Sequence, residues 1–103
     1  MTTKHSYAVS WREDGGLRHV GKLVFTPSAV TLDGRVASLE HAVRVLDWDR
    51  IRAASGERDD GRRLLVLALR PEGRIAIESL DRPGSLAELE HAICGRIDAG
   101  TPP

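Results

Sequence analysis

The sequence is poor in cysteine. Cys94 is the single cysteine among 103 residues, so the chain forms no internal disulfide and holds no cysteine-rich metal cluster. This usage excludes the disulfide-stabilised secreted domains and favours a reducing compartment. We therefore expect a cytoplasmic protein.

Long apolar runs are also missing. The amino-terminal residues MTTKHSYAVSWRED hold no apolar stretch of the kind found in a signal peptide. No segment of the sequence approaches the run of about 18 apolar residues that a membrane-spanning helix needs. We expect neither a cleaved leader nor a membrane span.

The chain carries no excess of charge of either sign. Its 15 basic and 15 acidic residues cancel, and the calculated isoelectric point is 6.9. Nucleic-acid-binding domains usually carry a basic excess, so we expect no nucleic-acid partner. A local basic patch stays compatible with these totals, because a zero sum leaves the arrangement of the charges open.

Length and composition predict one folded domain. Hydrophobic residues make up 41% of the chain and charged residues 29%, proportions that are ordinary for a globular protein. A chain of this length buries about 65% of the surface that its unfolded form exposes, which is enough for one core. We expect a single domain over residues 6–98, with flexible ends at 1–5 and 99–103.

Alternating apolar and polar residues predict about seven short strands. Tyr7, Val9 and Trp11 mark the first, and the second, over 17–26, places Leu23 and Phe25 on one face. The remaining strands are predicted within the segments 30–32, 36–39, 43–45, 64–69 and 73–79. Glycine-containing turns separate several of them. A bulge or bend is expected at 47–49, and a polar loop at 56–63.

One amphipathic helix is predicted near the end of the chain. Ser85 and Glu88 have the spacing of a capping box, in which each side chain satisfies an unpaired amide at the start of a helix. An apolar stripe then follows at intervals of three and four residues, formed by Leu86, Leu89, Ile93 and Ile97. We expect this stripe to cover the open end of an incompletely closed β-structure.

The order of these elements resembles the pleckstrin-homology (PH) superfold, and most of all its GRAM and bacterial PH-like domains. The stretch GKLVFTPSAVTLDG is similar to their early hairpin, VLDWDRIRAA to a phrase before a late strand pair, and LLVLALRPEGRIAIES to that pair. Residues 85–97 lack the tryptophan often found in the terminal helix of eukaryotic PH domains, which favours the bacterial branch.

This resemblance covers about residues 7–97 and has consequences for fold and activity. It implies a mainly β protein with one C-terminal α-helix, in which about seven antiparallel strands form a partly open barrel or sandwich plugged by that helix. It also implies a binding or scaffolding module, without identifying the ligand, because the superfold hosts lipid, peptide and protein binders.

The first predicted hairpin offers a candidate anion site. Four basic side chains surround its turn: Arg12, Arg18, His19 and Lys22. In lipid-binding members of the superfold, basic residues at this hairpin hold inositol phosphates, since a phosphate takes several charge-assisted hydrogen bonds. Glu13 and Asp14 in the same loop would repel that phosphate. A solvated hairpin without a ligand is the competing interpretation.

The two tryptophans are candidates for a contact surface. An exposed tryptophan marks such a surface, whereas burial in the core is the commoner position for so large a side chain. Trp48 lies beside the predicted bend. Trp48, with its neighbour Arg50, is therefore the better candidate for a partner surface.

The sequence carries no pattern of a catalytic, metal or cofactor site. No G-x-S-x-G turn and no Walker lysine occur. His91 and Cys94 supply two metal ligands on one helix, too few for a site. We expect a non-enzymatic module without a cofactor that binds a protein partner or a second copy of itself. The alternative is a peripheral module that recognises an anionic membrane head group or a small phosphorylated ligand through the first hairpin.

Overall fold

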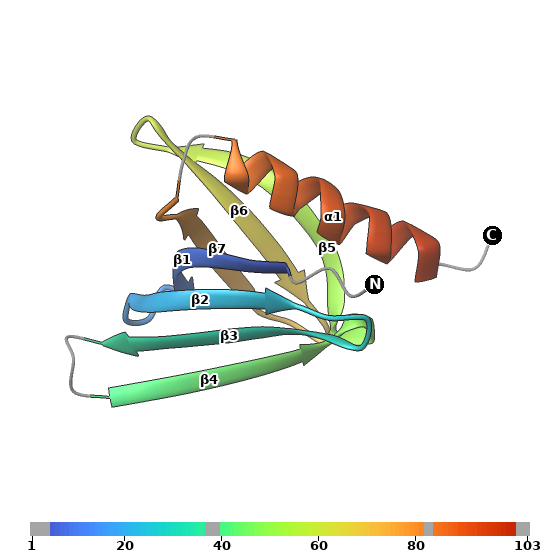
Figure 1. The fold of residues 1–103 in the computed structure, drawn as a ribbon, viewed down its shortest axis with the longest axis horizontal. Helices are drawn as coiled ribbons and strands as arrows, with labels where there is room; N and C mark the ends of the chain where they lie inside the picture. Colours follow the sequence, from blue (N-terminus) through green and yellow to red (C-terminus); the bar gives the residue numbers. More distant parts are fainter. Residues whose placement is uncertain (1–4, 37–39, 82–83, 101–103) are drawn as a thin grey trace.

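The computed structural model describes residues 5–36, 40–81 and 84–100. Within them the chain forms seven strands, a short 3-10 turn and one helix (Figure 1). In chain order these are β1 (His5–Glu13), β2 (His19–Phe25), β3 (Ala29–Val36), β4 (Glu40–Asp47), η1 (Trp48–Arg50), β5 (Ile51–Asp59), β6 (Arg62–Leu69), β7 (Arg74–Ser79) and α1 (Ser85–Gly100).

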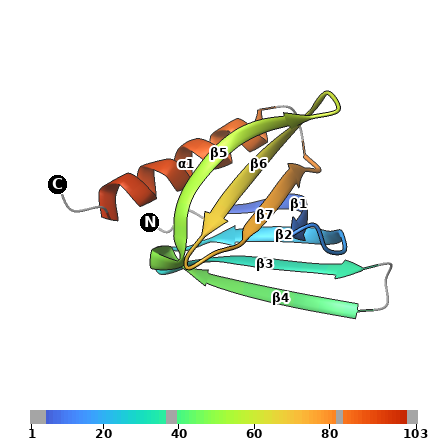
Figure 2. The ribbon, with the colours of Figure 1, turned by 180° about the vertical axis from the view of Figure 1, so that it is seen from behind.

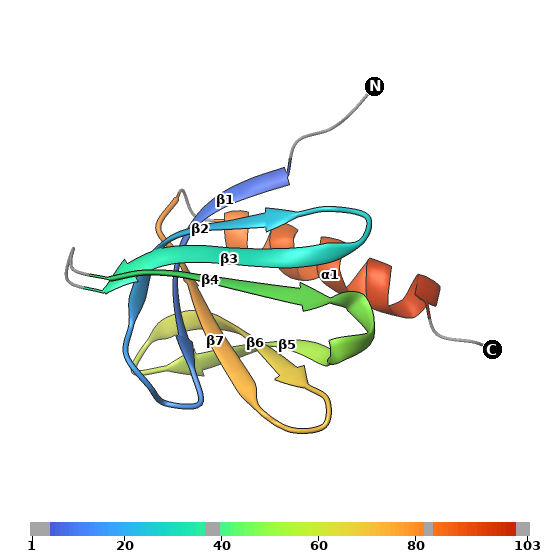
Figure 3. The same cartoon turned by 90° about the horizontal axis from the view of Figure 1, so that it is seen from below.

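All seven strands belong to one antiparallel sheet. Their order is β4-β3-β2-β1-β7-β6-β5, so β4 and β5 are its two edges. The sheet curls, and Figure 3 shows β2, β3 and β4 on one side of the molecule with β5, β6 and β7 on the other. The predicted fold class, mainly β with seven antiparallel strands and one C-terminal helix, is confirmed as an open sheet.

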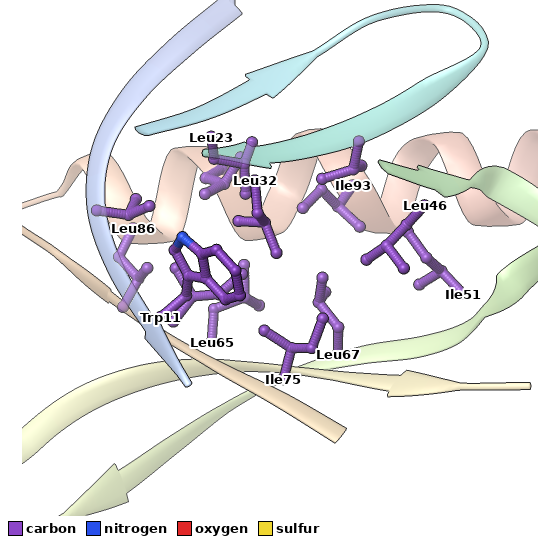
Figure 4. Packing of buried hydrophobic residues seen from close by; sticks show 14 of the residues in the cluster. Trp11, Leu23, Leu32, Leu46, Ile51, Leu65, Leu67, Ile75, Leu86 and Ile93 are labelled. Atoms are coloured by element: carbon purple, nitrogen blue, oxygen red, sulfur yellow. The ribbon is translucent and has the colours of Figure 1, made fainter. Parts of the chain in front are cut away.

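The core lies between the two halves of the curled sheet. Its members are the inward residues of the alternating pattern, including Val9 and Trp11 on β1, Leu23 on β2 and Leu32 on β3. Figure 4 shows Leu23, Leu32 and Leu46 from one half of the sheet and Leu65, Leu67 and Ile75 from the other pointing into the same interior. The predicted orientation of β2 is confirmed: Leu23 is fully buried, Phe25 packs against the core and Val20 is exposed.

The helix covers one open side of the sheet, as predicted. It packs mainly on β5 and also contacts β6 and β7 (Figures 1 and 2). Leu86, Leu89 and Ile93 are buried in the core, and Ile97 packs against it. The stripe therefore joins the helix to the core of the sheet.

The start of the helix differs from the predicted capping box. The helix begins at Ser85 itself, and the backbone N–H of Glu88 donates to the carbonyl oxygen of Gly84 at 3.0 Å. The first helical turn thus begins one residue earlier than the predicted cap requires. The Glu88 carboxylate lies near Tyr7 on β1, whose pKa is raised by burial and, to a smaller extent, by this negative charge.

The polar segment 56–63 is mostly strand, so the predicted loop is wrong. β5 runs to Asp59 and β6 begins at Arg62, which leaves Asp60 and Gly61 as the turn. Both turn residues have positive φ, 52° and 80°. This is the geometry of a two-residue hairpin, for which Asp-Gly is a preferred sequence. The cross-strand pair Asp59↔Arg62 extends the ladder up to the turn with opposite charges.

The bend expected at 47–49 is present in a shifted form. The 3-10 turn η1 covers Trp48–Arg50, and the β5–β6 register shifts between Ile51 and Ala53.

Of the segments predicted to be flexible, His5 lies in β1 and residues 99 and 100 continue α1. Residues 1–4 and 101–103, and residues 37–39 of the predicted strand 36–39, lie outside the described residues.

Candidate functional site

A shallow hollow of about 210 Å³ lies on the outer face of β1, β7 and β6. Its floor is formed by small or apolar side chains, among them Ser10, Leu64 and Ala76. Its walls are charged and carry both signs: Arg12, Arg18 and Arg62 against Asp59 and Glu78. The outward residues of three neighbouring strands, together with the β1–β2 loop, thus build one mixed-charge depression.

Two of the four predicted anion ligands meet in this hollow. Arg12 extends from β1 and Arg18 from the loop before β2, and both line it. Among the described residues neither guanidinium forms an ion pair, whereas Arg62 is 3.6 Å from a carboxylate oxygen of Glu78. Two unpaired guanidinium groups can take up an anion, although Asp59 in the same wall opposes it.

The other two predicted ligands lie elsewhere. His19 pairs with Trp11 across β1 and β2, and their rings stack with centroids 4.2 Å apart. Its Nδ1 is buried and, within the described residues, has no hydrogen-bond partner. Lys22 is exposed and stands in register with Ala8 and Asp33. The predicted four-residue cluster is therefore divided among the hollow, the core side and a neighbouring part of the outer face.

Trp48 is half-buried and committed to contacts inside the molecule. Its indole N–H donates to the carbonyl oxygen of Thr26 at 3.1 Å, and its ring meets Phe25 edge to face. The guanidinium of Arg96, on α1, lies 5.8 Å from the ring centroid. Trp48 therefore joins the β2–β3 turn to the helix, and little of its ring remains for a partner.

Arg50, the second residue of the predicted partner surface, is exposed next to this cluster. Its Nε donates to the carbonyl oxygen of Arg70 at 3.3 Å. In a second hydrogen bond between the same two segments, Nη1 of Arg70 donates to the carbonyl oxygen of Asp49 at 2.9 Å. This reciprocal pair holds η1 against the β6–β7 connection.

Sequence reasoning did not single out the outer edge of β4 as a binding surface. β4 pairs with β3 and with no second strand in the described part of the chain. In Figures 1 and 2 no other drawn helix or strand runs along its far side. On its outer face Val43 and Val45 have 52% and 56% of their surface exposed. The signal in the sequence was the alternation around these two valines, EHAVRVLD.

The β4 edge lacks several of the usual devices that prevent strand pairing, although Arg44 is an inward-pointing charge. Edge strands are commonly protected by lysine, proline, a bulge or a covering element. Residues 40–47 contain neither lysine nor proline, and the β3–β4 register runs from Ala29↔Asp47 to Val36↔Glu40 without a shift. The edge is therefore straight, regular and partly apolar.

The opposite edge, β5, has both a covering element and an irregularity. α1 packs on it, and its register with β6 shifts between Ile51 and Ala53. The fit is close at Gly56, where an added Cβ atom would lie 2.7 Å from Oε1 of Glu90 on the helix. The two sheet edges thus differ in the described structure: β5 has a helix packed on part of it and an irregular register, and β4 has neither.

The positive charge of Arg44, on β4, is neutralised within the chain itself. The guanidinium of Arg44 donates from Nε and Nη2 to the two carboxylate oxygens of Glu13 at 2.8 and 2.7 Å. These hydrogen bonds raise the pKa of Arg44 above its ordinary value. His41, on the outer face, pairs with Asp33 of β3. Arg44 consequently repels a strand approaching β4 less than a free cation would.

Two classes of site find no support in the described residues. No group of three or more His, Cys, Asp or Glu side chains among them is arranged to hold a metal ion. Within the same residues, α1 falls short of the length and apolar character that crossing a membrane would require.

Comparison with known proteins finds a similar fold among solved structures but identifies no family. No protein-family model and no curated protein sequence matches the chain. The C-terminal domain of an unknown protein from Leishmania infantum is similar, with a TM-score of 0.67, 16% identity and coverage of 86% of this chain and 81% of that chain. At that identity the similarity shows a shared fold alone.

A second solved structure, SsgB of Streptomyces coelicolor, gives a TM-score of 0.49 and 17% identity over 100% of this chain and 94% of that chain. Mutations in SsgB correlate to longitudinal cell division during sporulation of that organism.

Proposed function

We propose that this chain is a non-enzymatic binding module that holds a protein partner by strand addition at β4. The observation that carries the proposal is the difference between the two sheet edges. β5 has α1 packed on it and a shift in its register with β6, whereas β4 offers a regular ladder with no strand on its outer side in the described structure.

Strand addition suits this edge for two physical reasons. The unpaired N–H and C=O groups of an edge strand give an incoming strand main-chain hydrogen bonds, and the exposed side chains give it specificity. At β4 those side chains are Val43 and Val45, flanked by His41 and Asp47. A strand that presents apolar side chains at matching positions would bury the two valines, which contact solvent in the isolated chain.

We further infer that the module is PH-like, of the GRAM or bacterial type, and works in the cytoplasm. Seven antiparallel strands followed by one terminal helix are the arrangement that the sequence resemblance implies. The single cysteine supports a reducing compartment. A binding or scaffolding role agrees with the neutral balance of 15 basic and 15 acidic residues.

The test uses an end-capped peptide of residues 40–47, EHAVRVLD, as the incoming strand. Titration of the full chain with this peptide is expected to give saturable binding. Val45→Lys should weaken that binding about fivefold, because a lysine at the edge replaces an apolar cross-strand contact by a charge. The readout is fluorescence anisotropy of a labelled peptide.

Leu17→Lys provides the matched control. Leu17 is 68% exposed in the β1–β2 loop, so the same gain of charge is made away from β4, and peptide binding should stay at the wild-type value. Equal binding by wild type and Val45→Lys would contradict strand addition at this edge.

A second candidate function rests on Arg12 and Arg18, the two guanidinium groups that line the outer hollow without an ion pair in the described structure. They suit an anionic membrane head group or a small phosphorylated ligand. The expected result is that the chain sediments with anionic liposomes at low salt, much less at moderate salt, and not with neutral liposomes.

Arg18→Glu tests the residues behind this second function. The exchange should abolish liposome binding, because it turns one of two anion-binding groups into a repelling one. Lys22→Glu alters charge by the same amount outside the hollow and should reduce binding only slightly. Liposome binding that survives Arg18→Glu would remove the hollow as the site.

A further inference from the structure

We propose that the strand which pairs with β4 is β4 of a second copy of this chain, antiparallel to it about a two-fold axis. This inference rests on the proposed function of the edge and names its partner. It follows from the charge and apolar pattern of residues 40–47 when that segment is set against itself.

Side-chain direction limits the registers in which two copies can pair. Residues directly opposite each other in an antiparallel ladder project to the same face. The exposed residues of β4 have odd numbers and the half-buried or buried ones, from Ala42 to Leu46, have even numbers. A register that sets odd opposite even would place an exposed residue against a buried one and would turn one sheet over. The permitted registers therefore pair odd with odd.

One permitted register sets a compatible side chain opposite each outward-facing residue of β4. With Arg44 on the two-fold axis, Val43 of each copy stands opposite Val45 of the other. His41 stands opposite Asp47 in the same way. The outer face then gains two valine–valine contacts at its centre and an imidazole beside a carboxylate at each end. Apolar cross-strand pairs are stabilising, and an imidazole N–H can donate a hydrogen bond to a carboxylate.

The neighbouring permitted registers are poorer. Placing Val43 on the axis leaves Val45 opposite His41, and placing Val45 on the axis leaves Val43 opposite Asp47. Each keeps one valine–valine contact, on the axis, in place of two, and sets the other valine of each copy opposite a polar side chain. The favoured register does bring the two Arg44 residues face to face on the inner side, but each is held by both carboxylate oxygens of its own Glu13.

The fold permits this assembly and limits it to two copies. α1 packs on β5, β6 and β7, at the other end of the sheet from β4 (Figure 1), so it does not obstruct a strand at this edge. A two-fold interface uses the same edge on both molecules and closes on itself. The other edge, β5, has α1 packed on it and a register shift near Ile51, and both features disfavour extension of the dimer into a fibre.

The experiment is sedimentation equilibrium of the full chain, alone and in mixtures of variants. The wild-type mass is expected to rise with concentration from 11.3 kDa towards twice that value. Val45→Lys alone and Val43→Glu alone should each dimerise about tenfold more weakly. In an equimolar mixture, the introduced lysine of one chain faces the introduced glutamate of the other, while the remaining valine pair is kept. The mixture should return to within about threefold of wild-type affinity.

The control mixture combines Val45→Lys with Val45→Glu. It has the same net charges, but position 45 faces Val43 of the other copy in the favoured register, so the introduced lysine and glutamate do not face each other and the mixture should not recover dimer formation. Both substituted positions on β4 are more than half exposed, and circular dichroism should show every variant folded. A rescued mixture together with an unrescued control supports the two-fold register.

Failure of this inference can be told apart from failure of the proposed function. A chain that stays monomeric at all concentrations but binds the 40–47 peptide would overturn the second copy as partner and leave strand addition intact. A wild-type dimer whose variant mixture stays dissociated would overturn the register. A chain that neither dimerises nor binds the peptide would overturn both.

Discussion

Replacing Leu89 by aspartate is expected to abolish the folded state at room temperature. Leu89 has 1% of its surface exposed and sits in the core between the sheet and α1. Removing a buried leucine costs about 2–5 kcal/mol, and burying a carboxylate without a partner costs several more. Domains of this size are stable by only about 5–15 kcal/mol. The variant should show no cooperative transition in thermal or urea unfolding.

Ala87→Asp is the matched control on the same helix. Ala87 is exposed in the first turn, where a negative charge interacts favourably with the helix dipole. This variant should unfold within a few degrees of wild type. A Leu89→Asp protein that unfolds as cooperatively as Ala87→Asp would mean that the helix is dispensable, contrary to its position in the core.

Gly21→Ala is expected to be the second most damaging substitution. Gly21 on β2 faces Gly34 on β3, and the two backbones approach closely there. A Cβ atom at Gly21 would lie 2.1 Å from the carbonyl oxygen of Asp33 and 2.6 Å from Cα of Gly34. Both obstacles are backbone atoms, which cannot turn aside as a side chain can. We expect a loss of about 3 kcal/mol or more in the free energy of unfolding.

Gly95→Ala shows what the same change does where space is free. No described atom lies within 4 Å of a Cβ added at Gly95, and the residue is inside α1. Alanine should therefore stabilise the chain by up to about 1 kcal/mol through the helix propensity of alanine relative to glycine. Urea unfolding of both variants measures the contrast. A Gly21→Ala protein of wild-type stability would show that β2 and β3 are not so closely joined.

The architecture was largely predictable because buried apolar residues recur in the sequence at the period of a strand or of a helix. Leu23 and Phe25 alternate with polar or outward residues, and Leu86, Leu89 and Ile93 recur at helical spacing, so both faces were identified correctly. The segment 56–63 was mistaken for a loop because its side chains are polar. Its residues form the exposed end of a hairpin, where the ladder of backbone hydrogen bonds does not require apolar side chains.

The candidate sites were harder to predict because they depend on which strands become neighbours. Arg12 and Arg18 meet Arg62 and Glu78 only because β1 pairs with β7, a contact between the two ends of the chain. The alternation of side chains along a strand would have separated His19 from Lys22, because two residues three positions apart project to opposite faces of the sheet. The open edge was hidden for the same reason: the sequence marks β4 as a strand but does not show that only one side of it is paired.

The central claim is that β4 is the edge at which this module accepts a strand. The most direct measurement is amide hydrogen exchange of the full chain with and without the 40–47 peptide. Slower exchange at β4 amides, with β5 amides unchanged beneath α1, is the predicted result. Unchanged exchange along β4 at saturating peptide, or protection confined to β5 or to the hollow around Arg12, would contradict it.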